Sequence, residues 1–432
     1  MTPQTTAPWA ELRAIVGGEY LRPATPGDAV DRVAAQQVAE PGSAEELAHA
    51  LRVADAAGLA VIPRGGGTKL GWGHPPRRAD MILSTARLSR VVEHAWADMT
   101  ATVQAGCTVS DFQRALAQRG QRLALDALWA ERATVGGILA TNDSGALRVR
   151  FGSLRDLIIG VTIALPDGTL AKSGGKVVKN VAGYDLPKLA TGSLGTLGVI
   201  VEATFRLHPL PRETRSVSLT ADSADTLCKL ILAMLDSKLA YTGLQLRAGS
   251  GIEPRLDVRF EGTAGGIEAQ INVLHQLGNR AASAEVGSEV WNARETLWPR
   301  PDEASALGLT AKFSVLPAQL SAFCSLACRV ALTHGLLWGI VAQAVGTGVL
   351  RIEAQPQVPQ TELRNLLGAL AGLRAELEAL GATLVVLDCP QALKGGVDVW
   401  GSPGDAMPLM RRVKERLDPA ATLNPGRFVG GI

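Results

Sequence analysis

Apolar residues recur along this chain at two spacings, one typical of helices and one typical of strands. Leu47, Leu51 and Ala54 fall on one face of a predicted helix, and Ser43 with Glu46 forms a capping-box pattern at its start. The same reasoning predicts helices at 108–120, 224–235, 318–333, 361–380 and 405–417, and strands at 59–62, 81–83, 102–105 and 384–387. The order of these elements predicts an α/β opening and an α+β second part.

A glycine-rich turn follows the strand predicted at 59–62. Residues 63–73 read P-R-G-G-G-T-K-L-G-W-G. Glycine tolerates positive φ and has no Cβ, so successive N–H groups can point into one concavity that suits a phosphate. Thr68 adds a hydroxyl and Lys69 a point charge. The turn lacks the G-x-x-x-x-G-K-[ST] pattern of nucleoside-triphosphate loops. A tight turn between two surface elements remains the alternative.

Three more segments of this kind follow. Residues 133–144, A-T-V-G-G-I-L-A-T-N-D-S, predict a second glycine turn, and 151–168 predict a buried strand closed by a P-D-G turn. Residues 174–189 contain K-N-V-A-G-Y-D-L, and 192–207 predict a glycine-rich turn that leads into a strand. Four separated turns rich in exposed backbone suit a long, extended dinucleotide.

These motifs resemble the FAD-binding domain of the vanillyl-alcohol oxidase and p-cresol methylhydroxylase type. In that family P-R-G-G-G-T holds the diphosphate, T-V-G-G lies by the flavin, and G-x-L-G-V-I lines it with backbone groups. G-S-L-R-D-L-I-I-G, K-N-V-A-G-Y-D-L and the C-terminal L-D-P-A-A-T-L-N-P-G-R-F are similar to the FAD-binding subunits of bacterial glycolate oxidases. The resemblance is dense over 38–211, thin to about residue 412, and returns in the tail.

The resemblance implies non-covalent FAD, because Thr68 stands where relatives with covalent flavin commonly have histidine. It assigns no catalytic base. The residues it implies for the cofactor are Pro63, Arg64, Gly65, Gly66, Gly67, Thr68, Lys69, Thr134, Val135, Gly136, Gly137, Ser144, Lys179, Asn180, Tyr184, Gly198, Val199 and Ile200. An ordinary buried tyrosine is the alternative for Tyr184.

The implied fold class is α+β, with a two-part FAD-binding domain and a C-terminal α+β cap domain. We predict an N-terminal extension at 1–36, the FAD-binding domain at 37–211, the cap domain at 212–403, and a helix and tail at 404–432 that return to the FAD domain. The prolines at 209–211 mark the expected hinge.

Composition narrows the classes of function further. The 432 residues include 43 basic and 41 acidic side chains, a net charge of +2, with no basic run interleaved with aromatics, which argues against nucleic-acid binding. The five cysteines form no C-x-x-C pair, so no iron–sulfur cluster or zinc is expected in this chain. The N-terminus does not resemble a secretion signal, and the apolar stretch 335–350 is too short for a bilayer and predicts a buried strand. We therefore expect a cytoplasmic chain that meets the inner face of the membrane only through a complex.

Other polar residues have structural as well as functional interpretations. Seven basic against three acidic residues at 148–188 suit either a solvated face or a field that favours an anionic ligand. Asp156 beside Arg155 predicts an ion pair that fixes a loop. Arg294 or Arg300 could meet a carboxylate, although core packing with exposed arginines is the simpler reading.

The function implied by the resemblance is oxidation of glycolate to glyoxylate by a complex. Its expected partners are a larger flavoprotein subunit with the substrate histidines and an iron–sulfur subunit. The six histidines are widely separated and form no metal-ligand pair, and the H-x-G-D-G-N-x-H segment of complete α-hydroxy-acid dehydrogenases is missing after residue 211. Two alternatives are a self-sufficient FAD oxidase of another 2-hydroxy acid, sugar lactone or alcohol, and a flavin-free assembly subunit.

Overall fold

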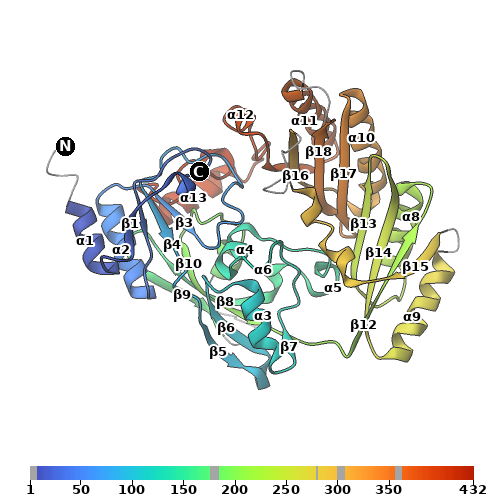
Figure 1. Ribbon diagram of the computed structural model, residues 1–432, viewed down its shortest axis with the longest axis horizontal. Coiled ribbons are helices and arrows are strands. Elements are labelled where there is room, and N and C mark those ends of the chain that lie inside the picture. Colours follow the sequence, from blue (N-terminus) through green and yellow to red (C-terminus); the bar gives the residue numbers. More distant parts are fainter. Residues whose placement is uncertain (1–6, 176–183, 279–280, 299–306, 356–361) are drawn as a thin grey trace. The chain divides into compact units, whose positions relative to one another are not determined.

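The computed structural model describes residues 7–175, 184–278, 281–298, 307–355 and 362–432. The chain forms two compact units (Figure 1). Unit 1 comprises Met1–Ser144, Gly152–Leu210 and Ser402–Ile432, and unit 2 comprises Gly145–Phe151 and Pro211–Gly401. The chain therefore leaves unit 1 twice and returns to it with its C-terminal segment.

Unit 1 is built on two main sheets. Its strands are β1 (Leu21–Pro23), β2 (Gln37–Ala39), β3 (Val61–Arg64), β4 (Met81–Ser84), β5 (Val91–Ala95), β6 (Thr100–Gln104), β7 (Gln121–Arg122), β8 (Ile158–Ala164), β9 (Leu170–Gly174), β10 (Val199–Arg206) and β11 (His208–Pro209). Its α-helices are α1 (Ala7–Val16), α2 (Ala44–Ala56), α3 (Val109–Ala117), α4 (Val135–Thr141), α6 (Leu154–Leu157), α7 (Leu186–Ala190) and α13 (Met407–Leu417).

Different helices pack on the two sheets of unit 1, although residues of β8 and β10 also join the hydrophobic cluster around α2. In the order β1-β2-β4-β3, strands β2, β4 and β3 run parallel, and Leu47, Leu51 and Ala54 of α2 are buried with this sheet as their spacing predicts. The order β5-β6-β10-β8-β9 is antiparallel throughout, and α3 and α4 pack on it around Phe112 and Phe205.

Unit 2 is one antiparallel sheet of eight strands in the order β15-β12-β14-β13-β17-β18-β16-β19. Helices α8, α9, α10 and α11 cover one face of it (Figure 1). The strands are β12 (Glu213–Thr220), β13 (Tyr241–Gly249), β14 (Ile252–Gly262), β15 (Ala282–Val286), β16 (Gly308–Ser314), β17 (Leu336–Gln343), β18 (Thr347–Ala354) and β19 (Thr383–Asp388). The helices are α5 (Arg148–Phe151), α8 (Ala224–Leu235), α9 (Ala264–Leu277), α10 (Leu320–Thr333), α11 (Glu362–Ala379) and α12 (Gln391–Lys394).

Local sequence rules located α2, α3, α8, α10, α11 and α13 and several strands, with three corrections. The turn expected at 133–144 is the short helix α4, because Thr134 caps it by accepting a hydrogen bond from the N–H of Gly137. The stretch 335–350 is not one strand but the hairpin β17–β18, turned at Gly346 with a φ of 83°. The capping box expected at Ser43 is only half formed. The Ser43 hydroxyl accepts from the N–H of Glu46, but the Glu46 carboxylate accepts from the N–H of Gly42 and not from that of Ser43. No helix in the described ranges is long and apolar enough to span a bilayer.

Candidate FAD site

The glycine-rich turn after β3 presents backbone donors to solvent. In the described part of the chain, the N–H groups of Gly66, Gly67 and Thr68 donate to no protein atom, and Gly66 and Gly67 are exposed. Gly67 has a φ of 73°, a conformation that favours glycine. Adjacent free N–H groups in such a turn form a concavity that binds anions.

The glycines before Gly67 are required by the protein's own packing. A Cβ on Gly65 would lie 2.0 Å from Thr134 Oγ1, and a Cβ on Gly66 would lie 1.8 Å from the carbonyl oxygen of Arg132. Neither distance is tolerated by real side chains. The turn therefore lies directly against the segment that leads into α4, and these two segments are held as close neighbours.

Helix α4 uses its own N-terminal donors within the protein. The N–H of Val135 donates to Cys107 at 2.9 Å, that of Gly136 donates to Ala105 at 2.8 Å, and that of Gly137 donates to the Thr134 hydroxyl at 3.3 Å. The T-V-G-G segment therefore shapes the site and offers a surface without side chains at Gly136 and Gly137, whereas the free donors come from the turn after β3.

The C-terminal tail joins the remaining loops. Leu423 pairs with Val61 of β3 as a parallel bridge. Asn424 donates from its N–H to the carbonyl of Val61 and from Nδ2 to the carbonyl of Leu194, at 3.0 and 2.7 Å. Lys414 Nζ donates to the carbonyls of Thr196 and Leu423 and pairs with Asp418. The tail thus fixes the 192–198 turn beside β3.

Arg427 supports the glycine-rich turn by hydrogen bonds to its carbonyl groups. Its side chain is only 2% exposed and donates to the carbonyls of Leu70, Trp72 and His74. Burial lowers the pKa of its guanidinium to about 10, so it stays charged at neutral pH. The quoted L-N-P-G-R-F sequence contained this residue, but only the structure places it at the site.

These segments enclose two adjoining grooves of about 430 and 460 Å³ within unit 1. Both are lined by Pro63, Gly65, Gly137, Ala140, Leu194 and Asn424, so they lie side by side, and together they are called the channel. The first is completed by Arg64, Thr85, Ala105, Gly136, Gly195, Gly198, Val199 and Ile200. The second is completed by Gly66, Gly67, Thr68, Lys69, Leu70, Thr134, Thr141 and Arg427.

Lys69 lines the channel, but its charge is engaged inside the protein. Its Nζ lies 3.4 Å from a carboxylate oxygen of Asp143 and 3.3 Å from the carbonyl oxygen of Leu128. It also lies within 6 Å of the ring centroids of Trp72 and Trp129. The side chain is 4% exposed. The point charge expected from the sequence is thus part of a buried ion pair with Asp143.

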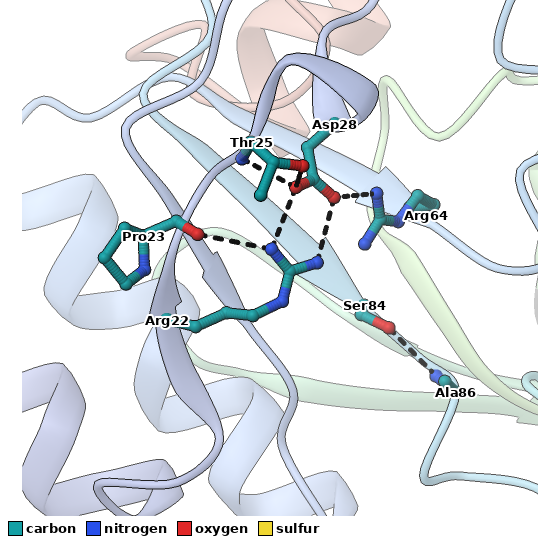
Figure 2. Close-up of polar contacts among 7 residues, drawn as sticks. All are labelled: Arg22, Pro23, Thr25, Asp28, Arg64, Ser84 and Ala86. Carbon is teal, nitrogen blue, oxygen red and sulfur yellow. Dashed lines mark hydrogen bonds and ion pairs between the residues drawn. The ribbon is translucent and has the colours of Figure 1, made fainter.

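Arg64 extends its side chain toward the N-terminal segment. Figure 2 shows the Asp28 carboxylate between the guanidinium groups of Arg22 and Arg64, at 2.8 and 2.7 Å. The hydrogen bond from Arg22 holds the pKa of the Asp28 carboxyl well below its usual range. Asp28 is the last residue of the 3-10 helix η2 (Pro26–Asp28), whose first residue is proline. No local sequence pattern indicates this contact.

Some residues assigned from the sequence do not line the channel. Val135 is fully buried in the core of unit 1, and Ser144 is buried as well. Tyr184 is 90% exposed, which excludes the buried-tyrosine alternative. Lys179 and Asn180 lie outside the described residues. The cofactor role of each individual residue stays a prediction.

Two other side chains differ from expectation. Asp156 accepts hydrogen bonds from the Ser153 N–H and hydroxyl at 2.8 and 2.9 Å, so it caps α6 instead of pairing with Arg155. Arg294 is 7% exposed, so it is not an exposed arginine. Arg300 lies outside the described residues. Among the described residues, no group of three or more His, Cys, Asp or Glu could hold a metal ion.

The channel suits a dinucleotide on three counts. It extends over two adjoining grooves, it has free backbone donors at the glycine-rich turn, and Arg64 and Arg427 are among its lining residues. A diphosphate needs such donors and positive charge, while an apolar ring needs the flat backbone surfaces at 136–137 and 198–200.

Two segments of the chain match models of known protein families. Residues 35–174 match the FAD binding domain model, and residues 402–428 match the C-terminal domain of FAD linked oxidases. Because the second match falls on the tail that completes the channel, FAD is the cofactor of this protein. The chain therefore carries an FAD-binding domain and a C-terminal segment similar to that of FAD linked oxidases.

The curated relatives include 2-hydroxy-acid enzymes. The chain is 30% identical to the glycolate oxidase subunit GlcD of Bacillus subtilis, over 48% of this chain and 44% of that protein. It is 35% identical to D-2-hydroxyglutarate dehydrogenase of Xanthomonas citri pv. viticola, over 45% and 42%. It is 26% identical to the mitochondrial cytochrome-type D-lactate dehydrogenase of Arabidopsis thaliana, over 90% and 72%. The first two alignments span less than half of each relative.

Solved structures confirm the fold class. An alkyldihydroxyacetonephosphate synthase superposes with a TM-score of 0.75 at 17% identity, over 99% of this chain and 86% of that one. The 4-ethylphenol oxidase of Gulosibacter chungangensis and p-cresol methylhydroxylase both give 0.75, at 16% and 13% identity, over 99% of this chain and 97% of each. The expected α+β fold of the p-cresol methylhydroxylase type is confirmed.

Proposed function

We propose that this chain is the FAD-binding subunit of a complex that oxidises glycolate to glyoxylate. The observation that carries the proposal is the FAD channel closed by the C-terminal tail, in a chain whose relatives act on 2-hydroxy acids. Bound FAD supplies a hydride acceptor for the α-hydrogen of the substrate. The chain's own residues bind the diphosphate, orient the ring and link the channel walls.

The proposed partners are a larger flavoprotein subunit and an iron–sulfur subunit, with this chain in the cytoplasm and near the membrane only through them. The missing H-x-G-D-G-N-x-H segment supports this division of labour. The similarity to D-lactate and D-2-hydroxyglutarate dehydrogenases supports a second candidate, a self-sufficient oxidase of another 2-hydroxy acid. The FAD-binding domain argues against a flavin-free subunit.

The test begins with the purified chain under anaerobic conditions. We expect a flavin spectrum after gel filtration and release of all flavin by acid precipitation, because the cofactor is not covalently held. Glycolate, D-lactate and D-2-hydroxyglutarate are then added in turn to the chain alone and to the co-expressed complex.

We expect glycolate to bleach the flavin of the complex and to leave that of the isolated chain oxidised. Bleaching of the isolated chain by any of the three acids would support the self-sufficient oxidase. Bleaching of the complex by D-lactate or D-2-hydroxyglutarate, but not by glycolate, would refute the proposed substrate.

A further inference from the structure

One carboxylate from the N-terminal segment reaches the wall of the FAD channel. Asp28 and Arg22 precede the matched FAD-binding region of residues 35–174, yet Asp28 contacts Arg64 at the end of β3. We propose that Arg22 and Asp28 form a positioning clamp that orients the Arg64 guanidinium toward an acceptor atom of bound FAD.

The Asp28 carboxylate is fully occupied by protein donors. Its Oδ1 accepts from Arg22 Nη2 at 3.0 Å and from Arg64 Nη1 at 2.7 Å. Its Oδ2 accepts from Arg22 Nη1 at 2.8 Å and from the N–H and hydroxyl of Thr25 at 2.9 and 2.8 Å. The side chain is 6% exposed. With five donors, this carboxylate has no capacity left for a ligand, so it acts through Arg64.

Arg64 keeps donors for a ligand. It lines the channel, its side chain is 17% exposed, and within the described residues only Nη1 has a protein acceptor. A guanidinium is a rigid planar fork, so one short hydrogen bond to Asp28 restricts the directions of Nε and Nη2 as well. These two nitrogens are the groups that we assign to FAD.

The charges of the clamp also suit an anionic cofactor. Two guanidinium groups share one carboxylate, which leaves one net positive charge at the channel wall. Without Asp28 the two cations would repel each other and Arg64 would lose its fixed direction. Asp28 lowers the positive charge of the wall, so by charge alone its replacement should strengthen FAD binding. Asp28 also fixes the direction of Arg64, so by geometry its replacement should weaken FAD binding.

The experiment measures FAD affinity and unfolding of the full-length apoprotein for Asp28→Glu, Asp28→Asn, Arg64→Gln and the double variant Asp28→Glu/Arg64→Gln. Asp28→Glu keeps the charge and moves the carboxylate by one methylene. The matched control is Asp80→Glu, because Asp80 is a buried carboxylate of the same unit that accepts from Arg78 and the N–H of Ala60 and does not line the channel.

We expect Asp28→Glu and Asp28→Asn to weaken FAD binding roughly ten- to a hundredfold, the effect of one charged hydrogen bond. In the Arg64→Gln background, Asp28→Glu should cause no further loss of affinity, although it still lowers the unfolding midpoint. Tighter binding by Asp28→Asn would show that only charge matters. If Asp28→Glu lowered FAD affinity as much in the Arg64→Gln background as in the wild-type chain, Asp28 would have a merely structural role. The same loss of affinity in Asp80→Glu would show this as well. Any of these results would overturn the clamp.

Discussion

Among single residues, Lys69 has a structural role in the protein that its place in the motif did not indicate. Lysine after a glycine-rich turn is a natural phosphate ligand, but here its ammonium is buried against Asp143, a carbonyl and two indole rings. A buried ion pair contributes little net stability, whereas removing one partner is costly because the other charge stays buried and unpaired.

We therefore predict that Lys69→Met lowers the free energy of unfolding of the apoprotein by about 3–5 kcal/mol. Lys69→Met/Asp143→Asn should recover part of this loss, since the unpaired carboxylate is removed. Urea unfolding of the three proteins measures both effects. A normal stability for Lys69→Met, together with a large loss of FAD affinity, would instead identify Lys69 as a phosphate ligand.

Cys107 gives a pH-dependent prediction at the same scale. Burial, with a smaller effect of Asp111, raises the pKa of its thiol to about 11, so the folded state favours the neutral thiol. Because the unfolded chain loses this proton at a lower pH, stability falls as the pH rises from about 9 to about 11. The difference in unfolding free energy between wild type and Cys107→Ala should shrink over this range. A constant difference would refute the raised pKa.

At the scale of elements, α4 is a wall of the channel rather than an anion-binding helix terminus. Its first N–H groups are bonded within the protein, and Ala140 and Thr141 near its end line the channel. Gly136 and Gly137 have no side chain and Ala140 has only a methyl group, so this face of α4 leaves room for the cofactor.

We predict that Ala140→Phe weakens FAD binding at least about tenfold with little change in apoprotein stability, because the added ring occupies the channel and not the core. Ala117→Phe at the end of α3 is the matched control, since Ala117 is an exposed helical alanine. Titration of both apoproteins with FAD gives the result. Equal affinities for the two variants would exclude α4 from the cofactor site.

At the scale of the whole molecule, the cofactor site depends on a unit assembled from three separate stretches of the chain. The glycine-rich turn, α4, the 192–200 turn and the tail all belong to unit 1, and Lys414, Asn424 and Arg427 connect them. A ligand that binds the folded state stabilises the segments that form its site, so its effect can be mapped along the sequence.

Hydrogen exchange of the chain with and without FAD should therefore show its largest gains in protection at 65–70, 135–141, 194–200 and 423–427. The β-strands of unit 2 provide the internal comparison within the same sample. Gains confined to β12–β19 would place the cofactor elsewhere and contradict the channel described here.

Local patterns in the amino-acid sequence located several helices, strands and glycine-rich turns. Periodic apolar residues located α2, α8 and α10, and glycine with its neighbours marked the turns after β3 and before β10, because helix faces, caps and turns depend on residues a few positions apart. The family motifs added the cofactor and the fold class.

The contacts between side chains of different loops follow from the tertiary fold and not from local sequence patterns. In the folded chain Lys69 pairs with Asp143, Val135 is buried in the core, Arg427 donates to the glycine-rich turn, and Asp28 accepts from Arg64. Arg427 lies more than 350 positions from its acceptors Leu70, Trp72 and His74, and Asp28 lies 36 from Arg64. The energies of such contacts depend on burial and on partners distant in sequence, so no local pattern of residues encodes them.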